Sequence, residues 1–234
     1  MSWPKKTLVF DTETTGIDVF NDRIVQLFIG IADENGELIE RHEWLIDPGI
    51  EVPEGASDVH GFTTEFLREN GGDPEEVLQE AAGVFAQYAD IPWVAFNANF
   101  DLSILYAEFT RHGIVSGWAE MVLGTWNVQL IDGLVIDRAK DRYRKGKRKL
   151  GNMADTYGNA YDPDALHDAG SDVELTAKVT RAIVNKYGIP SNAEQAEMYR
   201  AWAVNLEQFL QRSDPSASVD KDWPLKLKED GNGA

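Results

Sequence analysis

The sequence has no cysteine, no long apolar run and comparatively few basic residues. The absence of cysteine among 234 residues excludes disulfides and thiolate metal sites, and it is typical of a protein in a reducing compartment. No run of about 18 apolar residues occurs, so we expect no membrane span. The first residues, MSWPKK, lack the apolar core of a secretion signal. Together these absences predict a cytoplasmic protein.

Positive charge is scarce and unevenly placed. The chain has 40 acidic and 22 Lys and Arg residues, for a net charge of −18, which should repel nucleic acid at long range. Residues 138–149, RAKDRYRKGKRK, hold eight of the 22 basic residues and one acid, so this segment carries +7 and the remainder −25. Such a run is either a solvated loop or a grip on a phosphate backbone. The candidates for the grip are Arg144, Lys145, Lys147 and Arg148.

The hydrophobic pattern predicts strands that come first in succession and then alternate with helices. Asn35-Gly36 is a hairpin signal between the second and third strands. This order indicates a mixed α/β sheet flanked by helices, in one domain (1–189) with a C-terminal helix and tail (190–234). The tail from Ser213 is expected to be loose, or packed only through Trp223. The expected strands are 7–11, 23–33, 38–46, 92–97 and 127–132, and the expected helices 74–89, 100–113, 149–158, 167–188 and 192–212.

Acidic residues stand at the ends of predicted elements. Asp11 and Glu13 follow an apolar strand and, being two residues apart, point to one side of the sheet. They lie at the carboxyl end of that strand, where open α/β sheets place their sites. Asp101 opens the helix after the fourth strand, where it could also be a simple helix cap. His167 and Asp172 stand at the start of the long helix, whose polar start could equally be only a cap.

Brought together, these four carboxylates would repel one another by about 4 kcal/mol per pair at 4 Å, with an effective dielectric near 20. The cluster therefore needs protons or divalent cations near neutral pH. Ligands that are all oxygen select Mg²⁺ or Mn²⁺.

Three motifs carry a family resemblance. FDTETTG, NANFD and HDAGSD, in this order, resemble the exonuclease motifs of the DnaQ-like superfamily, in its DEDD-h branch of 3′→5′ exonucleases. The stretch VHGFTTEFL is similar to the segment between the first two motifs, and RYRKGKRKL followed by YG resembles actinobacterial and phage members. The likeness covers residues 7–188. It departs at Phe96-Asn97, where the family usually has His-Asn.

The resemblance implies an RNase H-like fold with a central five-stranded mixed sheet. It also implies two divalent metal ions, Mg²⁺ or Mn²⁺, with His167 as the general base. By the same likeness Thr14 and Thr15 hold the terminal nucleotide, and Ile17 lies near its base. The implied metal ligands are Asp11, Glu13, Asp101 and Asp172, and the implied pocket residues are His60, Asn97 and Phe100.

The expected function is hydrolysis of the last phosphodiester at a nucleic-acid 3′ end, with release of nucleoside 5′-monophosphates. Single-stranded DNA is the favoured substrate, and a polymerase is a possible partner. An exoribonuclease acting on RNA ends or short oligonucleotides is the first alternative. A catalytically silent module that binds nucleic acid or a polymerase is the second. The sequence does not indicate an oligomeric state.

Overall fold

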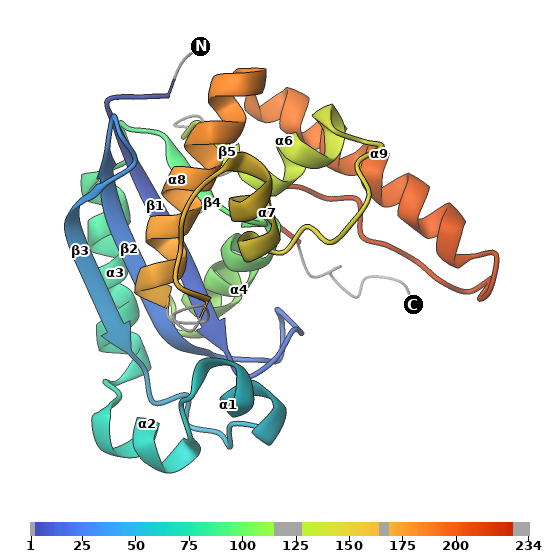
Figure 1. Ribbon diagram of the computed structural model, residues 1–234. Coiled ribbons are helices and arrows are strands. Elements are labelled where there is room, and N and C mark those ends of the chain that lie inside the picture. Colours follow the sequence, from blue (N-terminus) through green and yellow to red (C-terminus); the bar gives the residue numbers. More distant parts are fainter. Residues whose placement is uncertain (1–2, 115–127, 164–168, 227–234) are drawn as a thin grey trace.

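The computed structural model describes residues 3–114, 128–163 and 169–226, and it contains a five-stranded sheet with the order β3-β2-β1-β4-β5 (Figure 1). The strands are β1 (Lys6–Thr14), β2 (Ile24–Asp33), β3 (Leu38–Leu45), β4 (Trp93–Ala95) and β5 (Leu130–Asp132). The helices are α1 (Glu54–His60), α2 (Thr64–Asn70), α3 (Pro74–Gln87), α4 (Ala98–Arg111), α6 (Gly133–Lys140), α7 (Leu150–Tyr157), α8 (Ala169–Tyr187) and α9 (Asn192–Leu210). Within the described ranges, no helix combines the length and apolar character needed to cross a membrane.

The sheet is mixed, as the sequence predicts. Strands β1, β2 and β3 are antiparallel neighbours, whereas β4 and β5 run parallel to β1. The turn between β2 and β3 uses Gly36 at φ 82°, a conformation that glycine adopts without steric cost, and the Gly36 amide donates to the Asp33 carbonyl at 3.0 Å. The prediction of an RNase H-like fold with a five-stranded mixed sheet is confirmed.

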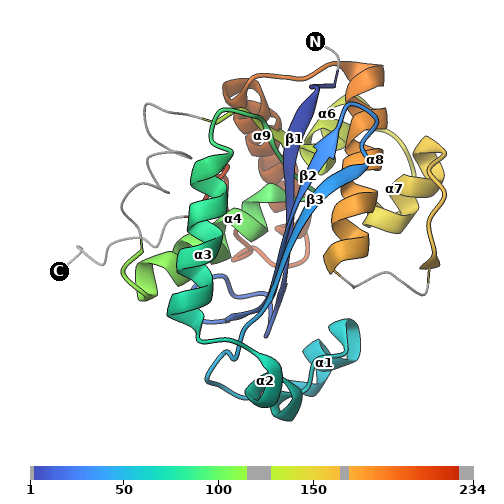
Figure 2. The same cartoon turned by 90° about the vertical axis from the view of Figure 1, so that its left-hand side faces the viewer.

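Helices cover both faces of the sheet. Figure 2 shows the sheet nearly edge-on, with α3 and α4 on one side and α7 and α8 on the other. Along β1, Leu8 and Phe10 belong to the apolar cluster that includes residues of α3 and α4. Val9 points the opposite way and belongs to the cluster that includes residues of α8. This alternation fixes the face to which each later residue of β1 points.

Local signals explain where two of the predicted helices begin. Asp73 caps α3, because its carboxylate accepts from the Glu75 and Glu76 amides, and Pro74 occupies the first turn. Ser191 and Glu194 form a capping box at the start of α9.

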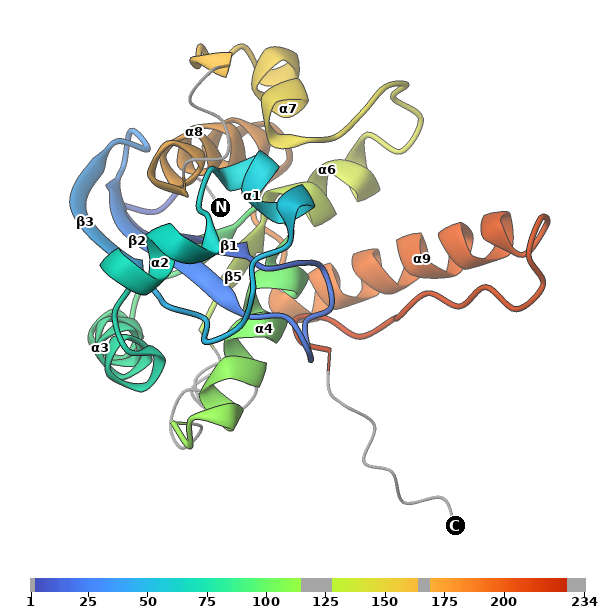
Figure 3. The ribbon, with the colours of Figure 1, turned by 90° about the horizontal axis from the view of Figure 1, so that it is seen from below.

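Three short helices were not predicted. Helices α1 and α2 lie between β3 and α3, beside one end of the sheet (Figure 3), and α6 follows β5 directly. Helices of seven or eight residues are marginal in isolation, so tertiary contacts rather than local periodicity stabilise them. Because α6 ends at Lys140, the first residues of the basic segment are helical instead of lying in a loop.

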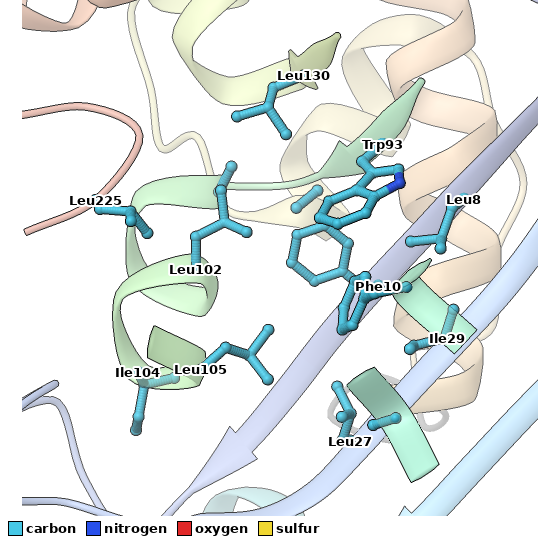
Figure 4. Packing of buried hydrophobic residues seen from close by; sticks show 14 of the residues in the cluster. Leu8, Phe10, Leu27, Ile29, Trp93, Leu102, Ile104, Leu105, Leu130 and Leu225 are labelled. Atoms are coloured by element: carbon cyan, nitrogen blue, oxygen red, sulfur yellow. The ribbon is translucent and has the colours of Figure 1, made fainter. Parts of the chain in front are cut away.

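The C-terminal part of the chain packs on the main core. Helix α9 extends away from the sheet (Figure 3), and the chain then returns so that Trp223 and Leu225 join the cluster of Leu8 and Phe10. Figure 4 shows Leu225 among the core residues, near Leu102. The expectation that the tail packs only through Trp223 is wrong, because Leu225 is as deeply buried.

Candidate active site

Three carboxylates converge at the carboxyl end of β1. Asp11 and Glu13 share the face of β1 on which Val9 packs against α8, and Asp172 lies in the first turn of α8 (Figure 1). One oxygen from each of these three side chains lies within 4.8 Å of the other two. The convergence that the sequence predicts for these residues is therefore present.

Asp101 reaches the same end of the sheet from the other face. Thr12 lies between Asp11 and Glu13 and therefore points toward α4, which carries Asp101. The Asp101 Oδ1 accepts from the Thr12 hydroxyl at 2.8 Å and from the Thr12 amide at 3.2 Å. Among the described residues, Asp101 does not join the 4.8 Å group. Its carboxylate is instead tied to the strand beside the group.

Burial and the neighbouring charges raise the pKa values of two of the acids. Burial raises the pKa of Asp11 well above its ordinary value, and the charges of Asp101, Glu13 and Asp172 raise it further. Burial also raises the pKa of Asp101 to about 7, although the Thr12 hydrogen bonds oppose the shift. Buried carboxylates of like charge retain protons unless a cation compensates them.

The donor set fits a hard divalent cation. The three converging groups offer carboxylate oxygens, which suit Mg²⁺ and Mn²⁺ better than softer metals. Asp101 is 3% exposed and adds a fourth carboxylate at the rim of the group. The cluster can thus hold a divalent metal ion.

Of the two histidines predicted at the site, the structure describes only His60. His167, the predicted general base, lies outside the described residues. His60 ends α1 and is buried, and its Nδ1 accepts from the Phe62 amide at 3.1 Å. Burial lowers the pKa of His60, while the nearby Thr14 carbonyl opposes the shift. This contact places His60 beside the end of β1, where the pocket is predicted.

The end of β1 and the loop after it hold Thr14, Thr15 and Ile17, which are predicted to contact the terminal nucleotide. The Thr14 hydroxyl donates to the Gly16 carbonyl at 2.7 Å. Thr15 is buried, and its hydroxyl donates to Asp22 at 2.9 Å and accepts from the Arg23 amide at 3.0 Å. These bonds fix the loop around Thr15. Ile17 is 89% exposed and so presents its apolar side chain to solvent.

Asn97 and Phe100 lie at the turn from β4 into α4. Asn97 has φ 77°, a left-handed conformation that Asn tolerates better than most residues. The Phe100 amide donates to the Asn97 carbonyl at 2.9 Å, and the Phe100 ring packs against the main core.

The basic segment is only partly available to a ligand. Arg144 Nη2 and Arg148 Nε each lie 2.6 Å from Oδ2 of Asp137, whose side chain is fully buried, and Tyr157 donates to the other oxygen of Asp137 at 2.7 Å. Two of the four predicted phosphate-binding residues thus already have internal partners. Lys145 and Lys147 are exposed.

Asp132 is absent from the predicted site residues, yet it stabilises the start of α4, the helix that carries Asp101. It is fully buried at the end of β5, and its carboxylate caps α6 through the Leu134 and Val135 amides. The same carboxylate accepts from the Asn97 and Ala98 amides at 3.3 and 2.9 Å, at the start of the helix that carries Asp101. The sequence could have indicated Asp132, because it is an acid at the end of an apolar strand, the same pattern that indicated Asp11.

The tail also contacts the start of α4. Trp223 Nε1 donates to Asp132 at 3.4 Å, and Asn99 Nδ2 donates to the Asp222 carbonyl at 2.8 Å. The Tyr199 hydroxyl of α9 donates to Asn99 at 3.3 Å. The C-terminal residues therefore stabilise the turn that presents Asp101.

Known proteins share this sequence pattern and this fold. A family model described as Exonuclease (RNase_T) matches residues 8–180. DNA polymerase III PolC-type from Thermotoga petrophila is 31% identical over 191 residues, which are 80% of this chain and 13% of that protein. The corresponding protein of Pediococcus pentosaceus is 27% identical over 187 residues, or 79% of this chain and 12% of that protein. The chain thus spans a small fraction of these relatives.

Solved structures show the same fold. E. coli exonuclease I in complex with a dT13 oligonucleotide superposes with a TM-score of 0.61 at 18% identity, covering 77% of this chain and 41% of that one. Exonuclease X in complex with 5′ overhanging duplex DNA superposes with a TM-score of 0.54 at 20% identity, covering 82% and 98%. Since the family model matches most of the chain, the protein belongs to the Exonuclease (RNase_T) family, and its resemblance to the DnaQ-like 3′→5′ exonucleases is confirmed.

Proposed function

We propose that the protein is a 3′→5′ exonuclease that hydrolyses the terminal phosphodiester of DNA and releases nucleoside 5′-monophosphates. The observation that carries this proposal is the convergence of Asp11, Glu13 and Asp172 within 4.8 Å, in a chain of an exonuclease family. Asp101, held by Thr12 at the same end of β1, completes the acidic set.

The four acids would hold a pair of Mg²⁺ or Mn²⁺ ions. When bound, such ions lower the pKa of water and stabilise the charge that develops on phosphate oxygens. The chain's own part is to fix the ligand oxygens. The sheet face places Asp11 and Glu13 opposite α8, while Thr12 restrains Asp101. We assign the general base to His167, whose ordinary pKa near 6.5 suits proton transfer close to neutral pH.

The substrate contacts are proposed from the loop and turns that surround the acids. Ile17 is exposed enough to contact the terminal base, and Thr14 and His60 lie together at the strand end. Thr15, by its internal bonds, would act by holding this loop in shape. Asn97 and Phe100 form the turn beside Asp101. DNA is favoured because exonuclease I and exonuclease X were solved with DNA.

The test uses single-stranded DNA labelled at its 5′ end, with Mg²⁺ or Mn²⁺. We expect a ladder that shortens from the 3′ end, and protection when the last linkages are phosphorothioates. Asp11→Asn should abolish shortening, whereas Asp90→Asn, a change at an exposed acid with no part in the site, should not. An oligonucleotide that stays intact with every divalent metal would contradict the proposal.

RNA is the second candidate substrate, because the matching family model carries the name RNase_T. Matched DNA and RNA oligomers of one sequence separate the two, since an enzyme that prefers RNA must use the 2′-hydroxyl or the helical shape that it imposes. A polymerase partner and a cytoplasmic location stay predictions. A silent binding module would bind oligonucleotides and leave both substrates intact.

A further inference from the structure

A groove outside the acidic site lies between α6, the loop that follows it, and α9. Its volume is about 620 Å³. In Figure 3 the loop after α6 and the extended helix α9 lie on the same side of the molecule. One wall carries Arg138, Arg142 and Arg148, and the other carries Met198 and Trp202. The groove therefore has a basic wall and an apolar, aromatic wall.

The arginines of the groove are held in different ways. Arg148 is anchored by Asp137 and by the Asp141 carbonyl, so its guanidinium is fixed at the wall. The Arg138 guanidinium lies 3.9 Å from the centroid of the Trp202 ring, and this contact joins the two walls. Arg142 is exposed. This wall belongs to the only strongly basic segment of a chain whose remainder carries −25.

The α9 wall carries apolar and aromatic side chains, on which a nucleic-acid base can stack, and it carries no positive charge among the residues that line the groove. Met198 and Trp202 are four residues apart and so share one face of α9. Glu194 and Glu197 also line this wall, although Glu194 already accepts from the Ser191 amide and hydroxyl. These acids disfavour phosphate on the α9 side. An anionic strand in the groove would therefore place phosphates against the arginines and bases against α9.

Helix α6 connects the groove to Asp132, the residue that supports the acidic site. α6 begins at Gly133, directly after Asp132, which caps both α6 and α4. Eight helical residues at 1.5 Å each make α6 about 12 Å long. The arginines at and beyond its far end thus lie about one helix length from Asp132, a span that a strand of several nucleotides can bridge because adjacent phosphates of one strand are at least about 3.4 Å apart.

We propose that this groove binds single-stranded nucleic acid upstream of the 3′ end, with phosphates on the Arg138 and Arg142 wall and a base stacked at Trp202. Basic grooves with aromatic side chains bind single strands with little sequence preference. The inference rests on the proposed nuclease function, which it deepens by assigning a second contact for longer substrates.

The test compares oligonucleotide lengths in the full chain carrying Asp11→Asn, so that the strand stays intact. Binding of 5′-labelled dT3 and dT12 is followed by fluorescence anisotropy across a range of salt. The double variant Arg138→Gln/Arg142→Gln and, separately, Trp202→Leu are compared with Arg200→Gln. Arg200 is an exposed arginine of α9 that does not line the groove.

We expect each groove variant to bind dT12 roughly tenfold more weakly, a loss in the range for one stacked base, with dT3 unchanged. The double arginine variant should also show a shallower salt dependence. Equal dT12 binding by the groove variants and the Arg200→Gln control would overturn the proposal. So would arginine-dependent binding of an acidic peptide that does not compete with dT12, because the occupant would then be protein.

The proposed function is tested separately by hydrolysis of dT3 with Asp11 intact. If dT3 is not hydrolysed, the proposed nuclease function is wrong, whereas the binding measurement still tests the groove. Hydrolysis of dT3 together with unchanged dT12 binding refutes only the groove.

Discussion

Replacing Asp132 with Asn should weaken the acidic site from a distance. The change converts one carboxylate oxygen into an amide that donates. If the amide replaces Oδ2, it faces the Ala98 amide, which donates at 2.9 Å, and Trp223 Nε1, which donates at 3.4 Å. The opposite orientation would face the three amides that donate to Oδ1, so the first is preferred. Two buried donors then lose their acceptor.

The magnitude follows from those donors. A buried group left without a partner costs about 1–3 kcal/mol, and the weaker Trp223 contact counts for less, so we expect a loss of roughly 2–4 kcal/mol in the free energy of unfolding. Burial raises the pKa of Asp132, which means that the neutral amide avoids part of the cost of a buried charge and keeps the loss toward the lower end. Displacement of the first turn of α4 moves Asp101, and loss of such a supporting residue typically lowers activity or metal affinity about 10–100-fold.

Three measurements check this account. Chemical denaturation gives the stability, hydrolysis of labelled DNA gives kcat/KM, and calorimetric titration gives Mn²⁺ affinity. The matched control is Asp73→Asn, which alters a capping carboxylate of α3 that accepts from two amides far from the acids. It should change stability little, because Asn caps a helix about as well as Asp, and it should leave activity unchanged. If Asp132→Asn loses stability but retains full activity and Mn²⁺ affinity, the inferred support of Asp101 is wrong.

Three further outcomes are expected. Because burial and neighbouring acids raise the pKa values of Asp11 and Asp101, the latter to about 7, metal-free protein should lose stability as pH rises from about 4 to 7. Melting scans in EDTA check this, and Mn²⁺ should raise Tm more at pH 8 than at pH 5; a flat profile would refute it. Thr12→Val should lower kcat/KM about tenfold by removing the hydroxyl bonded to Asp101. Thr7→Val should have little effect, because it removes a buried hydroxyl of β1 that has no hydrogen-bond partner among the described residues. Asp137→Asn should lower stability by about 2–4 kcal/mol in denaturant titrations, since the partly buried Arg144 and Arg148 lose a fully buried countercharge, although Arg144 keeps Asp141; the exposed change Lys145→Gln should not.

Local chemistry made much of the sheet and part of the site predictable. Asn35-Gly36 marks the β2–β3 turn, and Asp73-Pro74 marks the start of α3, because both depend on backbone preferences within a few residues. Alternation along β1 likewise predicts Asp11 and Glu13 on one face of the sheet.

What the sequence did not reveal depends on contacts between distant segments. The run of positive charge gave no sign that Arg144 and Arg148 converge on Asp137, because such pairing depends on how the loop after α6 folds back onto that helix. The supporting role of Asp132 was equally hidden, since it depends on how closely β5 approaches the turn before α4.

Because the C-terminal tail packs back on the main core, the chain cannot be truncated after the motif-bearing portion without exposing that core. The interior around Leu8 and Phe10 also contains Tyr199, Ala203, Trp223 and Leu225. Figure 4 shows Leu225 in this interior. A fragment that stops at residue 189 would uncover that interior, and each large apolar side chain removed from it withdraws about 1.5–3 kcal/mol of burial energy. The motif-bearing portion alone would then be prone to aggregate, which makes residues 190–226 part of the folded domain rather than an appendage.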